Sequence, residues 1–141
     1  MLVHKDGEWL PALDEASALP LYQQIVESVA LAVATGSLSP GDRLPSVRRL
    51  AAELRINPNT AARSIREMEA RGLSSPIRGV GSVVADDAPS EAKDLASGVL
   101  AREIDSTLQV AKNLGLGLST LLDSLRDRWK EVEECSSSSI E

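Results

Sequence analysis

The sequence predicts a mainly α-helical protein with a small β-wing. Three stretches lead to this fold class. Residues 44–72 hold two helical patterns joined by a short Asn-Pro turn, residues 73–85 place glycines among β-compatible side chains, and residues 90–134 hold two further helical patterns. We therefore expect an N-terminal winged helix-turn-helix, followed by an antiparallel pair of C-terminal helices that serve dimerisation.

The turn between the first two helices is defined by Asn57 and Pro58. Asn57 is a strong N-cap, because its side chain accepts a hydrogen bond from an unpaired N–H of the next turn. Pro58 suits the first helical position, where its missing N–H would be unpaired in any case. The preceding helix is expected to end near Arg55. The second helix is expected to end at Arg71, because Gly72 supplies a left-handed C-cap.

Each of these two helices has one apolar face, and the second also has a polar and cationic face. Apolar residues recur at helical spacing at Val47, Leu50, Ala51, Leu54, Ala61, Ala62, Ile65 and Met68. Asn, Thr and Arg side chains near the start of an exposed helix suit base edges and phosphates in a DNA major groove. The outward positions of the second helix are Asn59, Thr60, Arg63, Arg66 and Glu67.

A polar segment and one further helix precede this unit. Within residues 1–19, Trp9–Leu13 are able to form a short edge strand against the winged domain, and a frayed terminus is an equally good interpretation. The helix is expected to cover about 21–35 and to end at Gly36, with an apolar stripe formed by Leu21, Ile25, Val29 and Ala32 or Val33. Ser46 is then placed to cap the next helix.

Residues 86–134 are predicted to form a two-helix region after a polar boundary interrupted by Pro89. The helical patterns cover about 90–114 and 119–134, with a glycine-containing bend between them. Two helices of this length cannot enclose a core by themselves, so their apolar stripes need another surface. A second copy of the chain is the simplest candidate for this surface. The expected interface residues are Leu100, Ile104, Leu108, Leu118, Leu121, Leu122, Leu125 and Trp129.

The predicted organisation therefore has four parts. They are an N-terminal segment (1–19), a winged DNA-binding domain (20–85), a dimerisation region (86–134) and a tail (135–141). The tail is a low-complexity, serine-rich run that we expect to be disordered.

Charge is distributed unevenly along the chain. The net charge of the whole sequence is −6, which by itself argues against a nucleic acid partner. Residues 43–80, however, hold eight Arg and three Glu, whereas the segments on both sides are acidic. A basic island of this kind provides a local footprint for phosphates while the rest of the chain stays soluble.

The sequence contains no pattern typical of catalysis or of metal binding. His4 is the only histidine, and the acidic clusters have no His or Cys at ligand spacing. The run at 79–81 is too short for a phosphate-binding loop. We therefore expect neither an enzyme nor a cofactor. The single Cys135, with no signal peptide and no apolar run of membrane length, favours a cytoplasmic location, on the nucleoid when bound to DNA.

Three phrases of the sequence resemble the GntR family of bacterial transcriptional regulators. They are PLYQQI at 20–25, GSLSPGDRLPS at 36–46, and RGL at 71–73 with RGVG at 78–81. The run NPNT at 57–60 and the short C-terminal region resemble the YtrA-type subfamily. The resemblance covers nearly half the chain and implies a winged DNA-binding domain.

The resemblance also implies a set of DNA contacts. Arg48 matches an arginine of the first helix that contacts DNA, and Gly79 and Gly81 match wing glycines that let the hairpin approach the minor groove. Basic neighbours of these positions are within reach of phosphates, whereas a solvated helix face is the better interpretation for Arg55 and Arg71. The full candidate set is Arg43, Ser46, Arg48, Arg49, Asn57, Asn59, Thr60, Arg63, Arg78, Gly79 and Gly81.

The wing departs from the family pattern, which has more basic or hydroxylated residues there. Arg78 is the only cation of the segment 74–81. Pro76 removes a ladder donor, so its strand is expected to be short or at a sheet edge. We expect the wing to contribute less to affinity than the resemblance implies.

The resemblance points to a repressor that binds an inverted-repeat operator as a homodimer, with a transporter operon as its target. The short C-terminal region leaves little volume for an enclosed metabolite pocket, and the sequence identifies no small-molecule effector. A winged-helix adaptor that binds another protein is the alternative. Steep salt dependence and a preferred DNA sequence would distinguish the two.

Overall fold

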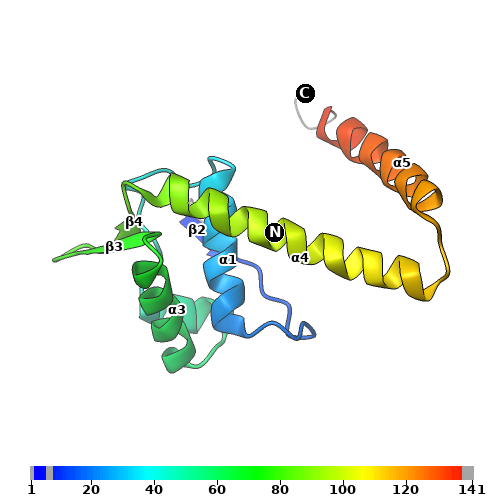
Figure 1. Ribbon diagram of the computed structural model, residues 1–141. Coiled ribbons are helices and arrows are strands. Elements are labelled where there is room, and N and C mark those ends of the chain that lie inside the picture. The colour runs from blue at the N-terminus through cyan, green and yellow to red at the C-terminus, as the bar shows by residue number, and fades with distance from the viewer. Residues whose placement is uncertain (1, 6–7, 138–141) are drawn as a thin grey trace. The chain divides into compact units, whose positions relative to one another are not determined.

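The structure is a computed structural model that describes residues 2–5 and 8–137. Its contacts divide the chain into two compact units, unit 1 (Met1–Val99) and unit 2 (Leu100–Glu141). The predicted fold class, mainly α with a small β-wing, is confirmed. Figure 1 shows the elements, which are β1 (Leu2–Lys5), β2 (Glu8–Pro11), α1 (Leu21–Ala34), α2 (Val47–Leu54), α3 (Pro58–Ala70), β3 (Ser74–Ile77), β4 (Gly81–Val84), α4 (Ala88–Asn113) and α5 (Leu118–Ser137).

The core of unit 1 forms around α1, which packs against α3 (Figure 1). Ile25 and Val29 of α1 are fully buried, as their helical spacing predicts. They meet side chains from α3, from the wing and from the first two turns of α4. Buried members of this cluster outside α1 are Leu38, Leu44, Met68, Leu73, Val84, Ala88 and Ala92.

Local capping explains where the helices of unit 1 begin and end. The Ser46 side chain accepts a hydrogen bond from the Arg49 N–H at 3.1 Å, and the Asn57 side chain accepts one from the Asn59 N–H at 2.8 Å. Gly36 and Gly72 follow α1 and α3 with φ of 81° and 74°, the left-handed values that glycine adopts without strain. These starts and stops agree with the sequence prediction within one or two residues.

The wing is a hairpin with a third segment alongside. β3 and β4 pair antiparallel, with Ser74 opposite Val84 and Ile77 opposite Gly81. On the other side of β4, a bridge links Arg43 to Val83. In the described part of the chain, β3 therefore has β4 as its one neighbour, so Pro76 lies in a short edge strand as expected.

The N-terminal segment contains a hairpin that the sequence predicted only in part. β2 overlaps the possible strand at Trp9–Leu13; it pairs antiparallel with β1 and lies against α1 of the winged domain. The loop that follows is tied to α1 through one side chain. Gln24 accepts a hydrogen bond from the Asp14 N–H at 2.9 Å and donates to the carbonyl oxygens of Asp14 and Leu19 at 3.0 and 2.8 Å.

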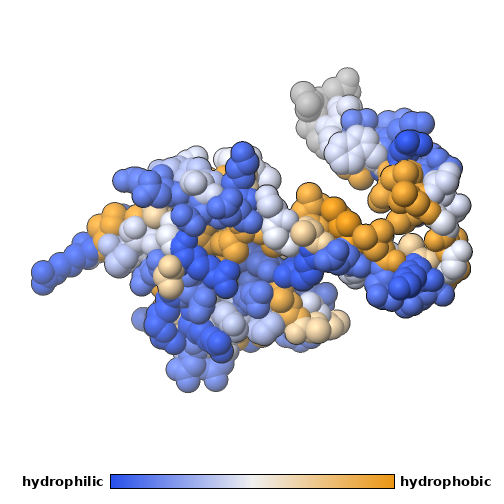
Figure 2. All heavy atoms as spheres, in the orientation of Figure 1, coloured by the Kyte–Doolittle hydropathy of each residue, from blue (hydrophilic) through white to orange (hydrophobic). Residues whose placement is uncertain are grey.

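Unit 2 consists of the C-terminal part of α4 and of α5. Its apolar side chains gather on the faces that these two helices turn toward one another (Figure 2). Most of them stay exposed. Among the described residues of this unit, Ala111 is buried and Leu121 is half-buried, while all others are exposed.

The two ends of the C-terminal helices differ from the simplest interpretation of the sequence. The first turns of α4 are part of the unit 1 core, because the small side chains of Ala88 and Ala92 fit against it. α5 continues to Ser137 and so includes three residues that were assigned to a disordered tail. The other tail residues, 138–141, lie outside the described residues.

Candidate nucleic-acid interface

The joint between α2 and α3 fixes where α3, the candidate recognition helix, begins. Arg55 caps α2 with φ 53°, a left-handed conformation that is uncommon for residues other than glycine. The chain then turns through Asn57, whose side chain caps α3, and Pro58 takes the first helical position. The start of α3 is therefore fixed by local chemistry.

The start of α3 presents the polar residues that the sequence selected. Asn57, Asn59 and Arg63 are exposed, and Thr60 is half-buried. The opposite face of α3 enters the core, where Met68 and Ala61 are fully buried. Ser64 also faces inward, and its hydroxyl donates to the Ala61 carbonyl oxygen at 2.7 Å, which the apolar pattern did not predict. The outward face therefore offers amide, hydroxyl and guanidinium groups to a partner.

Further candidate residues lie on α2 and just before it. Arg48 is exposed and Arg49 is half-buried in the first turn, while Arg43 is exposed on the segment paired with β4. Unpaired N–H groups at a helix start attract anions. Ser46 caps the start of α2, so its hydroxyl lies beside these N–H groups and the arginines. This combination of groups at the start of α2 suits a phosphate.

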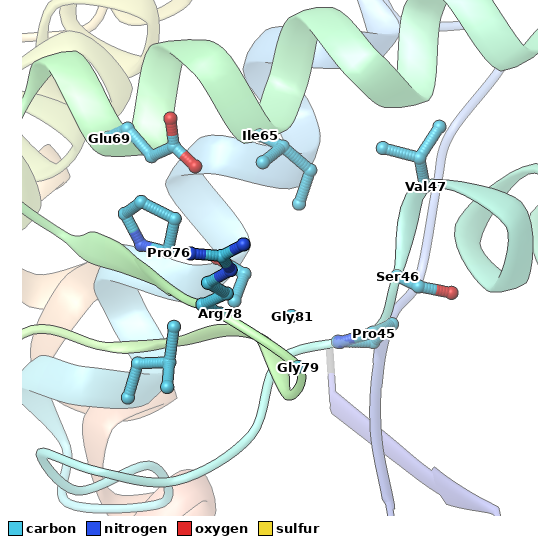
Figure 3. Close-up of a pocket in the computed structure, with 11 residues that line it drawn as sticks. Pro45, Ser46, Val47, Ile65, Glu69, Pro76, Arg78, Gly79 and Gly81 are labelled. Carbon is cyan, nitrogen blue, oxygen red and sulfur yellow. The ribbon is translucent and has the colours of Figure 1, made fainter.

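The tip of the wing and the start of α2 border one groove with a volume of about 570 Å³ (Figure 3). The groove brings together four of the predicted residues, Ser46, Arg78, Gly79 and Gly81, but not the arginines of α2. Most of its other walls are apolar. Glu69 of α3 and Arg78 of the wing both border it, so the groove offers one acidic and one basic side chain.

One contact of the interface was not predicted from the sequence. The guanidinium carbon of Arg63 lies 3.8 Å from the centroid of the Tyr22 ring, so α1 supplies a side chain to the recognition helix. Arg71, by contrast, lies 3.4 Å from the Glu67 carboxylate, four residues earlier on the same helix. This surface pair fits the interpretation of Arg71 as part of a solvated helix face.

Within residues 2–5 and 8–137, no group of three or more His, Cys, Asp and Glu side chains is arranged to hold a metal ion. In the same part of the chain, no helix is both long enough and apolar enough to cross a membrane.

Residues 21–84 match the family described as bacterial regulatory proteins of the gntR family. The chain is 35% identical over 111 residues to the HTH-type transcriptional regulator YhcF of Bacillus subtilis, a match that covers 78% of this chain and 90% of YhcF. The chain belongs to the GntR family. It is a DNA-binding transcriptional regulator and not an enzyme, and the resemblance seen in the sequence phrases is confirmed.

Other comparisons extend over both units. The HTH-type transcriptional repressor YtrA of Bacillus subtilis is 28% identical over 121 residues, covering 86% of this chain and 93% of YtrA. A solved GntR-family regulator from Listeria monocytogenes superposes with a TM-score of 0.66 at 26% identity, covering 82% of this chain and 98% of that one. A regulator from Oenococcus oeni gives 0.60 at 30% identity, covering 84% and 98%. The similarity to YtrA agrees with the predicted subfamily.

Proposed function

We propose that this GntR-family protein is a repressor that binds a palindromic operator as a homodimer. The observation that carries the proposal is a division of surface chemistry between the two units. Polar and cationic side chains surround the start of α3 in unit 1, whereas unit 2 exposes large apolar side chains. One surface suits DNA and the other suits a second copy of the chain.

The contacts to DNA are assigned by chemistry. Asn59, Thr60 and Arg63 at the start of α3 would read base edges in the major groove, because recognition helices present their N-terminal residues to the bases. Phosphates would be bound by the cap and the cations around the start of α2. The wing glycines would let the hairpin approach the minor groove. These phosphate and wing positions are Arg43, Ser46, Arg48, Arg49, Asn57, Arg78, Gly79 and Gly81.

The interface between subunits is assigned to unit 2. Leu100 and Trp129 are 62% and 66% exposed, and they belong to a series of large exposed apolar side chains on α4 and α5. α4 and α5 also line a groove of about 240 Å³, whose mostly apolar walls include Ile104, Leu108 and Leu125. An apolar stripe from a second copy would bury this surface. The remaining interface positions are Leu118, Leu121 and Leu122.

The assembly constrains the operator. A two-fold dimer presents two recognition helices, so the operator would be an inverted repeat with half-site centres roughly 10 base pairs, or a multiple of that, apart. Repression follows if the bound dimer occludes a promoter, and the similarity to the repressor YtrA supports this direction of control. Control of a transporter operon is what the resemblance to YtrA-type regulators suggests.

The test is selection of sequences from random duplex DNA with the purified chain at near-physiological salt. We expect enrichment of one inverted repeat, with affinity that falls steeply as salt rises because phosphate contacts release counterions. Enrichment of unrelated sequences, or of none, would contradict the proposal. Selection of a single site without symmetry would support sequence-specific DNA binding but contradict binding as a homodimer.

A further inference from the structure

The contact between Tyr22 and Arg63 joins two helices on the surface assigned to DNA. Tyr22 lies in the first turn of α1 and is half-buried, while Arg63 lies in the second turn of α3 and is exposed. Their separation of 3.8 Å, measured from the guanidinium carbon to the ring centroid, is well within the range of about 6 Å for a cation–π contact. The distance is that of a guanidinium lying on the ring.

The turn of α1 that carries Tyr22 is held by contacts of two neighbouring residues. Gln24, two residues after Tyr22, makes three hydrogen bonds to the loop before α1. Ile25 is fully buried in the core beneath the same turn. The first turn of α1 is therefore anchored on both sides, and a side chain that rests on Tyr22 loses part of its freedom.

Stacking and base reading use different parts of the guanidinium. The ring contacts its face, whereas its five N–H donors lie in the plane and point outward from the edge. An arginine edge can donate two parallel hydrogen bonds to O6 and N7 of guanine. Arg63 can therefore contact Tyr22 and a guanine at the same time.

We propose that Tyr22 is a positioning residue that holds Arg63 ready to read a guanine in each half-site. The proposal rests on the proposed function, which assigns Arg63 to the DNA. An arginine that is already restrained loses less conformational entropy when it binds. Sequence preference at that base pair thus depends on α1 as well as on the recognition helix.

The first experiment uses the complete chain without DNA. Tyr22 is the only tyrosine of the sequence, so ring-labelled tyrosine gives a single set of NMR signals. We expect Arg63→Ala to shift these signals and the matched control Arg66→Ala, three residues further along the exposed face of α3, to leave them in place. Unchanged ring signals in Arg63→Ala would overturn the contact itself.

The second experiment measures operator affinity by fluorescence anisotropy, with the selected operator and with versions in which each guanine of the half-site is replaced. Tyr22→Leu should bind the operator about two- to fivefold more weakly per half-site, because an unrestrained Arg63 loses more rotamer freedom when it binds. It should also lower the penalty for replacing one particular guanine. Tyr22→Phe keeps the ring and should restore wild-type affinity and preference.

A double-mutant cycle separates this proposal from the proposed function. Tyr22→Leu should have no further effect in an Arg63→Ala background. If Arg63→Ala weakens binding but Tyr22→Leu adds the same loss with and without Arg63, only the positioning role is overturned. Tighter binding by Tyr22→Leu would also overturn it, because the ring would then hold Arg63 away from the base. If Arg63→Ala leaves affinity and preference unchanged, its assignment to DNA fails as well.

Discussion

Unit 1 and unit 2 are both built largely from amphipathic helices, but they treat their apolar faces in opposite ways. In unit 1 the apolar faces of α1 and α3 meet the wing and the start of α4 and form a core with fully buried side chains such as Ile25 and Met68. In unit 2 the apolar stripe of α4 and α5 is mostly exposed. Unit 1 therefore encloses a core of its own, whereas the described residues leave most of the apolar stripe of unit 2 exposed, which supports the proposed subunit interface.

α4 contributes to both kinds of packing. Its early residues Ala88 and Ala92 are fully buried in unit 1, whereas Leu100 and Ile104, farther along, are exposed in unit 2. Small residues at a four-residue spacing suit close packing against a formed core. Large exposed residues at the same spacing suit a helix–helix interface. One helix thus changes its role along its length.

The largest expected effect concerns the core of unit 1. Ile25→Ala should lower the free energy of unfolding by about 2–5 kcal/mol, because it removes a fully buried side chain and leaves a cavity. Urea denaturation followed by circular dichroism measures the change. Leu31→Ala on the same helix is the control, since Leu31 is exposed and should cost far less. Equal losses in the two variants would contradict the assignment of the core.

The next effect concerns the apolar stripe of unit 2. Leu122→Asp with Leu125→Asp should produce monomers, because charges placed in an apolar interface would be buried without partners. Sedimentation velocity measures the oligomeric state. Thr120→Asp with Ser124→Asp adds the same charge to α5 outside the stripe and should leave the dimer intact. If the leucine variant still sediments as a dimer, the interface lies elsewhere.

A smaller effect is expected at the recognition helix. Arg63→Ala should weaken operator binding by about 1–3 kcal/mol and flatten the preference among sequences. Arg71→Ala is the matched control, because Arg71 is paired with Glu67 near the end of α3 and carries no assigned base contact. Anisotropy titrations with operator and scrambled duplexes measure the operator affinity and the preference for the operator sequence. Equal losses in the two variants would remove the base-reading role of Arg63.

The smallest effect concerns the joint between α2 and α3. Arg55→Gly should raise the free energy of unfolding by up to about 1 kcal/mol, since Arg55 has a left-handed φ of 53° that costs a residue with a Cβ. Gly72→Ala is the converse case. Its φ is 74° and a new Cβ would lie 3.3 Å from Glu91 Cγ, so that variant should be less stable. A loss of stability in Arg55→Gly would show that contacts of the Arg55 side chain stabilise the fold by more than the left-handed backbone conformation costs.

Helix ends that are fixed by residues close in sequence were predicted correctly from the sequence. Ser46, Asn57 and Gly72 mark helix ends through contacts within a few positions, and the structure has these ends where they were expected. The family and the winged fold followed from the same local phrases. Helical spacing alone also identified Ile25 and Met68 as core residues.

Features that depend on distant residues were not predicted. β1 and its pairing with β2, the bridge between Arg43 and Val83, and the stacking of Arg63 on Tyr22 join segments that no periodicity connects. The burial of Ala88 also depends on the core that it meets, not on the polar residues around it. Such contacts depend on tertiary packing between distant segments, and a local sequence pattern carries no information about it.

In the proposed function, unit 1 binds DNA and unit 2 joins two copies of the chain into a dimer. The most direct test compares binding of the wild-type chain and the Leu122→Asp, Leu125→Asp variant to the full inverted repeat and to a single half-site. We expect the two proteins to bind the half-site equally well, and the wild type alone to prefer the full repeat, by a factor on the order of 100. A variant that keeps this preference, or that also loses half-site affinity while its helices remain folded, would contradict the division between the units.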